Sequence, residues 1–368
     1  MHAFFTALEM DTSEYIDDYE GGLNYTDSYN DSSRSSYSDC DQEDRWLQVF
    51  QMVFLPLVYS LVFVLGLAGN GLMVTVLLRR KGSLRITEIY LLHLGLADLL
   101  FLSTFPFVVA KEAVGWVFGV FLCKLLSVLA HLNLLCGSLL LACISFDRYL
   151  AIVHAIPSVH NRRPRAVHLT CALLWTICLG LSVPEAVFTT VIDHPASGPA
   201  CSYEGIEGSN WTLLSRSLTH LLGFFAPLAV MGYCYSAVVL TLCRSQRSLE
   251  KQGAVRLALL LTAVFCFCWL PYNLTKLLDT LVIVGPLAGL SCDSKGLLMQ
   301  SLVVSESIGY MHCCLNPILY AFMGVRFRKE LLRLLGKWRL CRVCLPAQYS
   351  SRTSFSEGLT ATTNSKLI

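Results

Sequence analysis

One acidic residue, Asp98, stands in the middle of a long apolar run of the sequence. In an apolar setting an ionised carboxylate costs several kcal/mol unless it is paired or hydrated. A polar nest with Asn70, Asn133 and Asn316 that holds a sodium ion and waters would meet this need. The alternative is a protonated or hydrogen-bonded Asp98 with a structural role. We expect a sodium site, with Asp98, Asn133 and Asn316 around the ion.

The sequence contains no motif typical of an enzyme: it has no nucleophile–base pair, no phosphate-binding loop and no metal-ligand spacing. The sixteen cysteines include two close pairs, Cys266/Cys268 and Cys313/Cys314, that invite a metal interpretation. Residues that are adjacent or two apart on a helix point in different directions around its axis. We therefore expect these four cysteines to be packing residues, and we expect that the protein is not an enzyme.

The elements that must position these residues are long and apolar. Of the 368 residues, 54% are hydrophobic and only 15% are charged, with a mean hydropathy of +0.56. Soluble domains are about a quarter charged, and a membrane helix needs about twenty apolar residues to cross the hydrocarbon core. Seven segments are long enough: 50–78, 87–110, 119–153, 166–190, 212–243, 254–284 and 297–323. They predict an all-α membrane protein with a seven-transmembrane helix bundle.

The distribution of charge predicts the orientation of the chain. Residues 1–45 carry twelve Asp and Glu against two Lys and Arg, a net charge of −10 in a chain of +2 overall. Lys and Arg gather in the loops after the first, third and fifth segments and beyond the last one. Such enrichment is typical of the cytoplasmic side. We expect the N-terminus outside the cell and the C-terminus in the cytoplasm.

Composition divides the chain into four regions. Residues 1–45 form an acidic extracellular N-terminus whose polarity predicts disorder, and residues 46–325 form the bundle. Residues 326–340 have the apolar spacing of a short amphipathic helix lying on the cytoplasmic face of the membrane, with Cys341 and Cys344 as candidate palmitoylation sites behind it. The Ser/Thr-rich residues 341–368 predict a disordered cytoplasmic tail.

Four cysteines fall at or near the predicted outer surface: Cys40, Cys123, Cys201 and Cys292. An even number of cysteines in an oxidising compartment indicates two disulfides. Four cysteines allow three pairings, and their positions alone do not choose among them.

Short motifs occur once per segment and in a fixed order. They are Gly69-Asn70, Leu94 to Asp98, Asp147-Arg148-Tyr149, Trp175, Pro227 with Tyr235, Cys268-Trp269-Leu270-Pro271, and Asn316-Pro317 to Tyr320. This set resembles the rhodopsin-like G-protein-coupled receptors. The segments Thr104–Pro106, Trp116–Gly119, Asp147–His154 and His312–Pro317 resemble, more narrowly, the CXC chemokine receptors.

The resemblance implies a signalling switch inside the bundle. In that family the Arg at the position of Arg148 rests against the Asp at Asp147 and turns toward Tyr235, Tyr320 and the G protein on activation. The switch residues that it implies are Asp147, Arg148, Tyr149, Tyr235, Trp269, Pro271, Asn316, Pro317 and Tyr320. The alternatives are a surface ion pair at Asp147 and a plain core aromatic at Trp269. The family commonly has Ser where this chain has Gly137, which removes one oxygen from the expected sodium site, although Ser138 is adjacent.

The resemblance also implies an extracellular protein ligand, a small basic CXC chemokine. The acidic N-terminus would attract it, and the family's tyrosines become sulfated in acidic contexts such as those of Tyr15, Tyr19, Tyr25 and Tyr29. The implied ligand-binding residues are these four tyrosines with Asp17, Asp18, Glu204, Glu207, Asp279 and Glu306. The implied disulfides are Cys123–Cys201 and Cys40–Cys292, and the glycosylation sequons begin at Asn24, Asn30 and Asn210.

On the cytoplasmic side the resemblance implies coupling to a Gi protein, with receptor kinases and arrestin acting on the Ser/Thr-rich tail. The implied protein is a multi-pass plasma-membrane receptor that drives calcium release and migration of immune cells. A scavenging receptor, which internalises chemokine without G-protein coupling, is the alternative. A transporter or channel would need a continuous polar path and usually a repeat, and the sequence shows neither.

Overall fold

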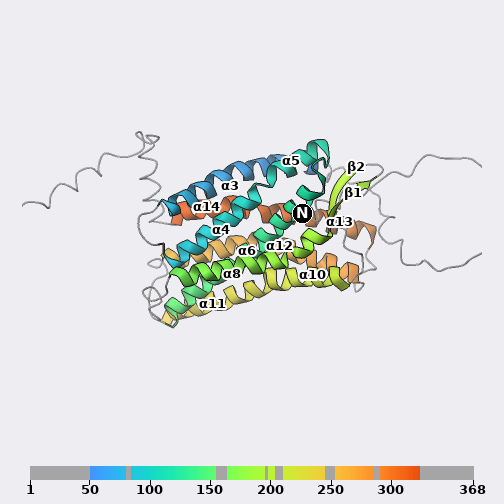
Figure 1. The fold of residues 1–368 in the computed structure, drawn as a ribbon. Coiled ribbons are helices and arrows are strands. Elements are labelled where there is room, and N and C mark those ends of the chain that lie inside the picture. Colours follow the sequence, from blue (N-terminus) through green and yellow to red (C-terminus); the bar gives the residue numbers. More distant parts are fainter. Residues whose placement is uncertain are drawn as a thin grey trace, which may run out of the picture.

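The computed structural model describes residues 50–79, 84–154, 164–194, 198–203, 210–244, 253–284 and 291–323. The predicted acidic N-terminus, the predicted helix at 326–340 and the predicted tail lie outside these residues. Long helices run alongside one another, and a two-stranded sheet covers one end of them (Figure 1).

The described chain is almost entirely helical. In order its elements are η1 (Phe50–Phe54), α3 (Leu55–Leu78), α4 (Ile86–Leu102), α5 (Phe105–Val114), α6 (Gly119–Ile152), α8 (Pro164–Leu181), α9 (Val183–Phe188), β1 (Thr189–His194), β2 (Gly198–Tyr203), α10 (Asn210–His220), η2 (Leu221–Phe225), α11 (Ala226–Arg244), α12 (Gly253–Val284), α13 (Cys292–Tyr310) and α14 (His312–Met323). Six stretches of the described residues are long and apolar enough to cross a membrane: Met52–Leu78, Ile86–Lys111, Gly119–Ile152, Arg165–Phe188, Leu213–Arg244 and Val255–Ile283. They match the first six predicted segments.

The seventh predicted segment, 297–323, is formed by α13 and α14, which are separated by the single residue Met311. Proline explains several of the interruptions in the helices, because it has no N–H for the carbonyl four residues earlier. Pro106 is the second residue of α5, just after the break that ends α4, and Pro227 follows the π-helical turn η2. Pro271 and Pro317 lie inside α12 and α14. The predicted seven-helix bundle is therefore confirmed, with its last helix in two pieces.

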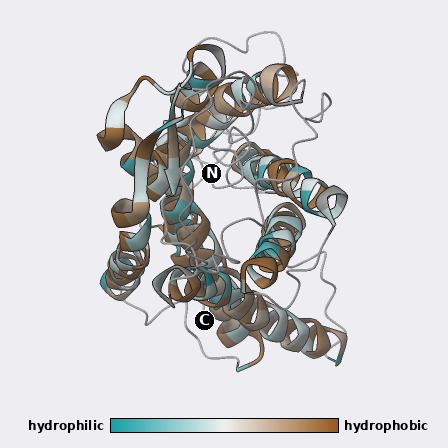
Figure 2. Cartoon of the chain, turned by 90° about the vertical axis from the view of Figure 1, so that its right-hand side faces the viewer, coloured by the Kyte–Doolittle hydropathy of each residue, from teal (hydrophilic) through white to brown (hydrophobic). Residues whose placement is uncertain are grey.

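The centre of the bundle is α6, which packs against α4 on one side and α11 on the other. In its most apolar stretch 67% of the residues are buried, compared with 22% for Arg165–Phe188. Large apolar side chains that remain exposed, among them Leu57, Phe121, Leu169 and Phe267, lie on the spanning helices. Hydrophobic residues make up much of the helices in an end view (Figure 2). The exposed apolar side chains suit contact with hydrocarbon, since lipid tails are as apolar as these side chains.

The strands β1 and β2 form an antiparallel hairpin at one end of the bundle, the predicted extracellular end. Cys201 of β2 faces Val191 of β1 in the register and forms a disulfide with Cys123 near the start of α6. Both cysteines are fully buried. The bond ties the hairpin to the central helix and confirms one of the two implied disulfides, whereas Cys40 and the side chain of Cys292 lie outside the described residues.

Candidate functional site

Below the β1–β2 hairpin the structure contains a cavity of about 750 Å³, including the part that is open to solvent. Six elements line it: α6, α9, β2, α10, α12 and α13. Charged side chains of both signs reach it, from Glu185, Arg216, Lys276 and Glu306. Concave sites with a few convergent polar groups are the usual form of ligand sites. This cavity is the candidate ligand pocket.

The Glu306 carboxylate lies on the α13 wall of the pocket, at 1% exposure. The hydroxyl of Tyr310, one turn further along α13, donates a hydrogen bond of 2.6 Å to Glu306 Oε1. A hydrogen bond to a carboxylate is stronger than one between neutral groups. The predicted ligand residue Glu306 is therefore held in place on the pocket wall before any ligand arrives.

Asp279 is surrounded by two cations that the sequence analysis did not anticipate. Its Oδ2 lies 2.8 Å from Arg216 Nη1 and 3.3 Å from Lys276 Nζ. Arg216 and Lys276 line the pocket, whereas Asp279 is not among the described residues that line it. Ligand contact by Asp279 stays a prediction, and in this structure its carboxylate pairs with the pocket's cations. The sequence contained a signal that could have identified Arg216 and Lys276 as site residues, since ionisable residues within membrane helices usually have a functional role.

Two further polar groups shape the wall near the hairpin. His131 has one ring nitrogen 3.0 Å from Ser182 Oγ and the other 3.0 Å from Thr219 Oγ1, so that it links α6 to the segments on both sides. Tyr203 at the end of β2 also lines the pocket. Burial, together with the nearby charge of Glu185, raises the pKa of the Tyr203 phenol. The phenol therefore stays neutral at physiological pH and keeps a proton that it can donate.

The indole of Trp269 lies at the inner end of the pocket. Its ring lies 5.9 Å from the ring of Tyr310 and 5.5 Å from that of His312, measured between centroids. A Cβ atom added at Gly309 would lie 2.9 Å from the indole, so a glycine is needed there for the close approach of α13. Trp269 thus contacts both the ligand pocket and the polar residues below it.

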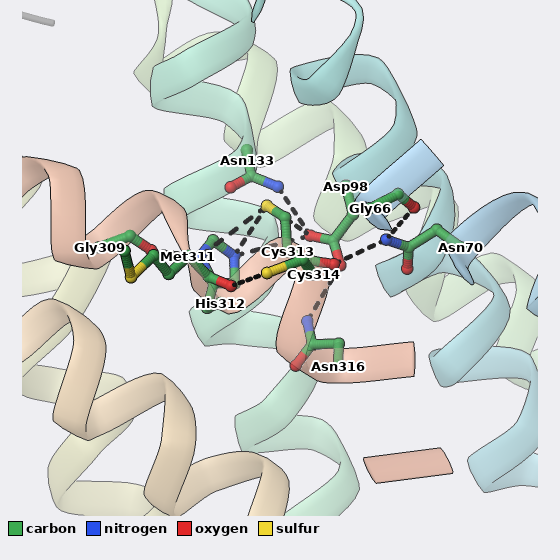
Figure 3. Close-up of polar contacts among 10 residues, drawn as sticks. All are labelled: Gly66, Asn70, Asp98, Asn133, Gly309, Met311, His312, Cys313, Cys314 and Asn316. Atoms are coloured by element: carbon green, nitrogen blue, oxygen red, sulfur yellow. Dashed lines mark hydrogen bonds and ion pairs between the residues drawn. The ribbon is translucent and has the colours of Figure 1, made fainter. Parts of the chain in front are cut away.

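Those polar residues form a buried cluster around Asp98 (Figure 3). Asn133 Nδ2 donates to Asp98 Oδ1 and Asn316 Nδ2 donates to Oδ2, each at 3.0 Å. The thiol of Cys313 lies 3.5 Å from Oδ1, and His312 Nε2 lies 3.6 Å from the same oxygen. The structure thus brings together the three residues of the expected sodium site, and it adds two that the sequence analysis did not place there. Sodium at this site stays a prediction.

Asn70 belongs to the same cluster, but its side chain donates hydrogen bonds to backbone carbonyls. Pro317 lacks the N–H that would bond to the carbonyl of Cys313, four residues earlier. Asn70 Nδ2 donates to that Cys313 carbonyl at 2.8 Å, and to Gly66 O at 3.0 Å. A Cβ atom at Gly69 would lie 2.7 Å from Pro317, so the pair Gly69-Asn70 lets α3 pack closely against the proline and supplies its missing donor.

At the opposite end of the bundle, Arg148 is held in a closed arrangement. Its Nη2 lies 2.5 Å from Asp147 Oδ2 and donates to Thr87 Oγ1 on α4 at 2.9 Å. The Asp147 side chain is 3% exposed, so the pair is shielded from water on the acidic side. The contact between Asp147 and Arg148 is the one that the resemblance implies for a resting receptor. The sequence analysis missed Thr87, since an ordinary Thr at the start of a helix carries no signal of its own.

The three tyrosines of the implied switch, Tyr149, Tyr235 and Tyr320, differ in their hydrogen bonds. The hydroxyl of Tyr235 accepts a hydrogen bond of 3.3 Å from Thr262, and the buried hydroxyl of Tyr320 has no partner among the described residues. Tyr149 is bonded to His154 at 3.0 Å. No bond from Arg148 to Tyr235 or Tyr320 occurs in the described part of the chain, which agrees with a resting state.

Several predicted site residues lie outside the residues that the structure describes. They are Tyr15, Asp17, Asp18, Tyr19, Asn24, Tyr25, Tyr29, Asn30, Glu204, Glu207, Cys341 and Cys344. Asn210 is the first residue of α10, and its side chain is also outside the description.

Comparison with known proteins agrees with this arrangement. Residues 69–320 match the family of seven-transmembrane receptors of the rhodopsin type. The chain belongs to this family, so it is a multi-pass protein of the plasma membrane and not an enzyme.

Among curated proteins, the human C-X-C chemokine receptor type 5 is 41% identical over 367 residues, covering 97% of this chain and 98% of the relative. The human C-X-C chemokine receptor type 3 is 40% identical and covers 89% of this chain and 90% of the relative. The human type 1 receptor is also 40% identical, over 82% of this chain and 84% of the relative. The chain therefore belongs to the C-X-C chemokine receptors. Short sequence features, such as Leu8–Asp11 and Val114–Gly119, predict the greatest similarity to type 5, with type 3 as the alternative.

Proposed function

We propose that the protein is a receptor that binds a basic CXC chemokine outside the cell and couples this binding to a Gi protein, with calcium release and cell migration as the response. The observation that carries the proposal is the position of Trp269, which lines the ligand pocket and contacts His312 of the polar cluster. A ligand that reaches Trp269 can thus alter the packing that surrounds Asp98.

Two separate surfaces support binding of a basic protein in two steps. The −10 charge of residues 1–45 attracts a basic ligand over roughly a Debye length and speeds the encounter. The flexible end of the ligand then enters the pocket between Glu306 and the cations Arg216 and Lys276. Contacts with the acidic residues 1–45 mainly increase affinity for the ligand, and contacts in the pocket trigger signalling.

The Asp147–Arg148 pair supports coupling to a G protein. An agonist shifts a two-state equilibrium only through its different affinity for the two states. Arg148 has such states available, because it is held now by Asp147 and Thr87 while the hydroxyl of Tyr320 lacks a partner among the described residues. This arrangement favours a signalling receptor over the alternative, a scavenging receptor without G-protein coupling.

The chain is 41% identical to the human type 5 receptor, and the resemblance to type 5 receptors implies a role in homing of B cells. The test exposes cells that carry the receptor to a panel of CXC chemokines and records calcium and cAMP with and without pertussis toxin. We expect a toxin-sensitive response to at least one chemokine and no response from cells that carry Arg148→Ala at equal surface expression. Uptake of a chemokine without any toxin-sensitive signal in the unmodified receptor would instead support the scavenging receptor.

A further inference from the structure

The buried cluster in Figure 3 contains three side chains that commonly bind metals. Asp98 comes from α4, and His312 and Cys313 come from the first turn of α14. All three are fully buried, and their nearest ligand atoms lie within 4.8 Å of one another. The sequence predicted a packing role for Cys313 because adjacent side chains on a helix point in different directions. Its neighbour Cys314 does point elsewhere, since the Cys314 thiol contacts the carbonyl of Met311 at 3.1 Å.

The hydrogen bond of the His312 ring indicates which nitrogen is available. Nδ1 lies 2.6 Å from the carbonyl oxygen of Gly309, and because a carbonyl cannot donate, Nδ1 must carry the proton of this bond. In a neutral ring the lone pair is then on Nε2, which faces Asp98 Oδ1 at 3.6 Å and Cys313 Sγ at 3.5 Å. Histidines that bind metals usually donate their other N–H to a carbonyl or carboxylate in this way.

The spacing of the three atoms matches the edges of a tetrahedral zinc site. With metal–ligand distances of about 2.0–2.1 Å for nitrogen and oxygen and about 2.3 Å for sulfur, the edges of the tetrahedron are roughly 3.3 to 3.6 Å. In the structure the N–O edge is 3.6 Å, the N–S edge is 3.5 Å and the S–O edge is 3.5 Å. Ordinary rotamer adjustment of a few tenths of an ångström would suffice to bind the ion.

The donor atoms suit a borderline or soft metal better than a hard one. Sodium prefers oxygen ligands, as calcium and magnesium do, whereas nitrogen and sulfur take two of the three positions here. Position 137 is a glycine and offers no oxygen, and Ser138 Oγ donates to Leu135 O. Asn316 presents an N–H group, and not an oxygen, to the carboxylate of Asp98.

We propose that Asp98, His312 and Cys313 form a binding site for a divalent metal of the zinc type. On binding, the Cys313 thiol releases its proton to solvent and becomes a thiolate, so that Zn²⁺, thiolate and carboxylate together are neutral in the low-dielectric interior. The fourth position falls to Asn133, whose buried Oδ1 has no partner among the described residues. A half-turn of its amide places this oxygen where Nδ2 now lies, 3.0 Å from Asp98 Oδ1.

A metal at this position would join α4 to α14 directly. The His312 ring lies beside Trp269, and Asn316 follows on the next turn of α14. The bound ion would therefore restrain the residues that connect the pocket to the polar cluster, and it would favour the resting state of the receptor.

The test uses the purified full-length receptor in lipid nanodiscs, with Zn²⁺ alone as the probe. Bound zinc is measured after dialysis, and Co²⁺ replaces zinc for spectroscopy, because a thiolate ligand produces a charge-transfer band in the near ultraviolet. We expect one tightly bound ion and the thiolate band. Cys313→Ser, which keeps a hydroxyl beside Asp98, should weaken zinc binding more than about a hundredfold, since even loss of a supporting hydrogen bond costs about 10- to 100-fold.

Cys314→Ser is the matched control, because its thiol is adjacent in sequence but bonds to a backbone carbonyl. It should bind zinc like the unmodified receptor. His312→Gln is the second variant, since its amide can still donate to Gly309 O while it lacks the imidazole lone pair, and it should lose binding as Cys313→Ser does. Equal zinc binding by Cys313→Ser and the unmodified receptor, a cobalt spectrum without the thiolate band, or no zinc bound at all would each overturn the proposal.

Discussion

Replacing Asn70 by Ala tests whether this side chain serves as the missing donor of a proline-interrupted helix. The variant loses the 2.8 Å bond to Cys313 O and the 3.0 Å bond to Gly66 O. The Gly66 carbonyl keeps the backbone donor of its own helix. The Cys313 carbonyl has no such donor, because residue 317 is proline. The loss therefore falls mainly on one buried carbonyl.

The magnitude follows from the cost of an unsatisfied buried group. Leaving a buried acceptor unpaired costs about 1–3 kcal/mol, and side-chain hydrogen bonds inside membrane proteins reach about 1.7 kcal/mol. Asn70 is fully buried, and its Oδ1 has no partner within the described residues, so its removal adds no loss from that atom. We expect Asn70→Ala to destabilise the receptor by about 1–2 kcal/mol, or a few degrees in apparent Tm.

The decisive measurement is a double-mutant cycle with Pro317→Ala. Alanine at 317 restores a backbone N–H that can bond to Cys313 O, so Asn70→Ala should cost about 1 kcal/mol less in that background. Thermal unfolding of purified receptor is followed with a thiol-reactive fluorophore, which reports the buried free cysteines as they become exposed.

Asn273 provides the control for this cycle. Its Nδ2 donates to Trp269 O at 2.9 Å within α12, where the backbone N–H of residue 273 remains available to the same carbonyl. Asn273→Ala should therefore lower the free energy of unfolding by the same amount whether residue 317 is Pro or Ala. If Asn70→Ala also costs the same in both backgrounds, the assignment of Asn70 as the substitute donor is wrong.

Four other substitutions probe the pocket and the switch. Arg148→Ala should keep chemokine binding and abolish G-protein signalling, and normal signalling would remove its role. Thr87→Ala deletes the 2.9 Å bond to Arg148 and should raise agonist-independent Gi activity, measured as lower cAMP; unchanged basal activity would show that the bond does not hold the resting state. Gly309→Ala places a methyl group 2.9 Å from the Trp269 indole, so it should lower the free energy of unfolding by about 1–3 kcal/mol and alter basal signalling. A variant with the Tm and the signalling of the unmodified receptor would contradict the close packing. Glu306→Lys should reduce signalling in a calcium assay more than radioligand binding, and equal loss of both would argue against separate binding and signalling surfaces.

The fold could be predicted from the sequence because the bilayer imposes a length on each helix. All six stretches that meet the length and apolarity of a span match predicted segments, and the seventh prediction corresponds to α13 and α14. The break at Met311 was not predicted. Hydropathy averages over many residues and does not report where a single backbone bond is lost.

Contacts between residues far apart in the sequence were predictable only through family motifs. The Asp147–Arg148 pair needed no such help, because the two residues are adjacent. The number of cysteines left three pairings open, and only the family resemblance implied the Cys123–Cys201 disulfide. The ion pair between Asp279 and Arg216 joins residues 63 positions apart, and nothing in the spacing of charges along the chain indicates it. Residues that the motifs did not include, such as Thr87, were missed.

The sequence by itself determined that the chain crosses the membrane, which segments do so, and that Asp98 needs a partner there, because apolar length and the cost of a buried charge are properties of the residues alone. Only the tertiary structure decided what surrounds that carboxylate. His312 and Cys313 lie more than 200 positions away along the chain, and the packing of α14 against α3 and α12 places an imidazole and a thiol within 3.6 Å of one oxygen. The identity of a ligand site depends on such distances, and the order of residues does not contain them.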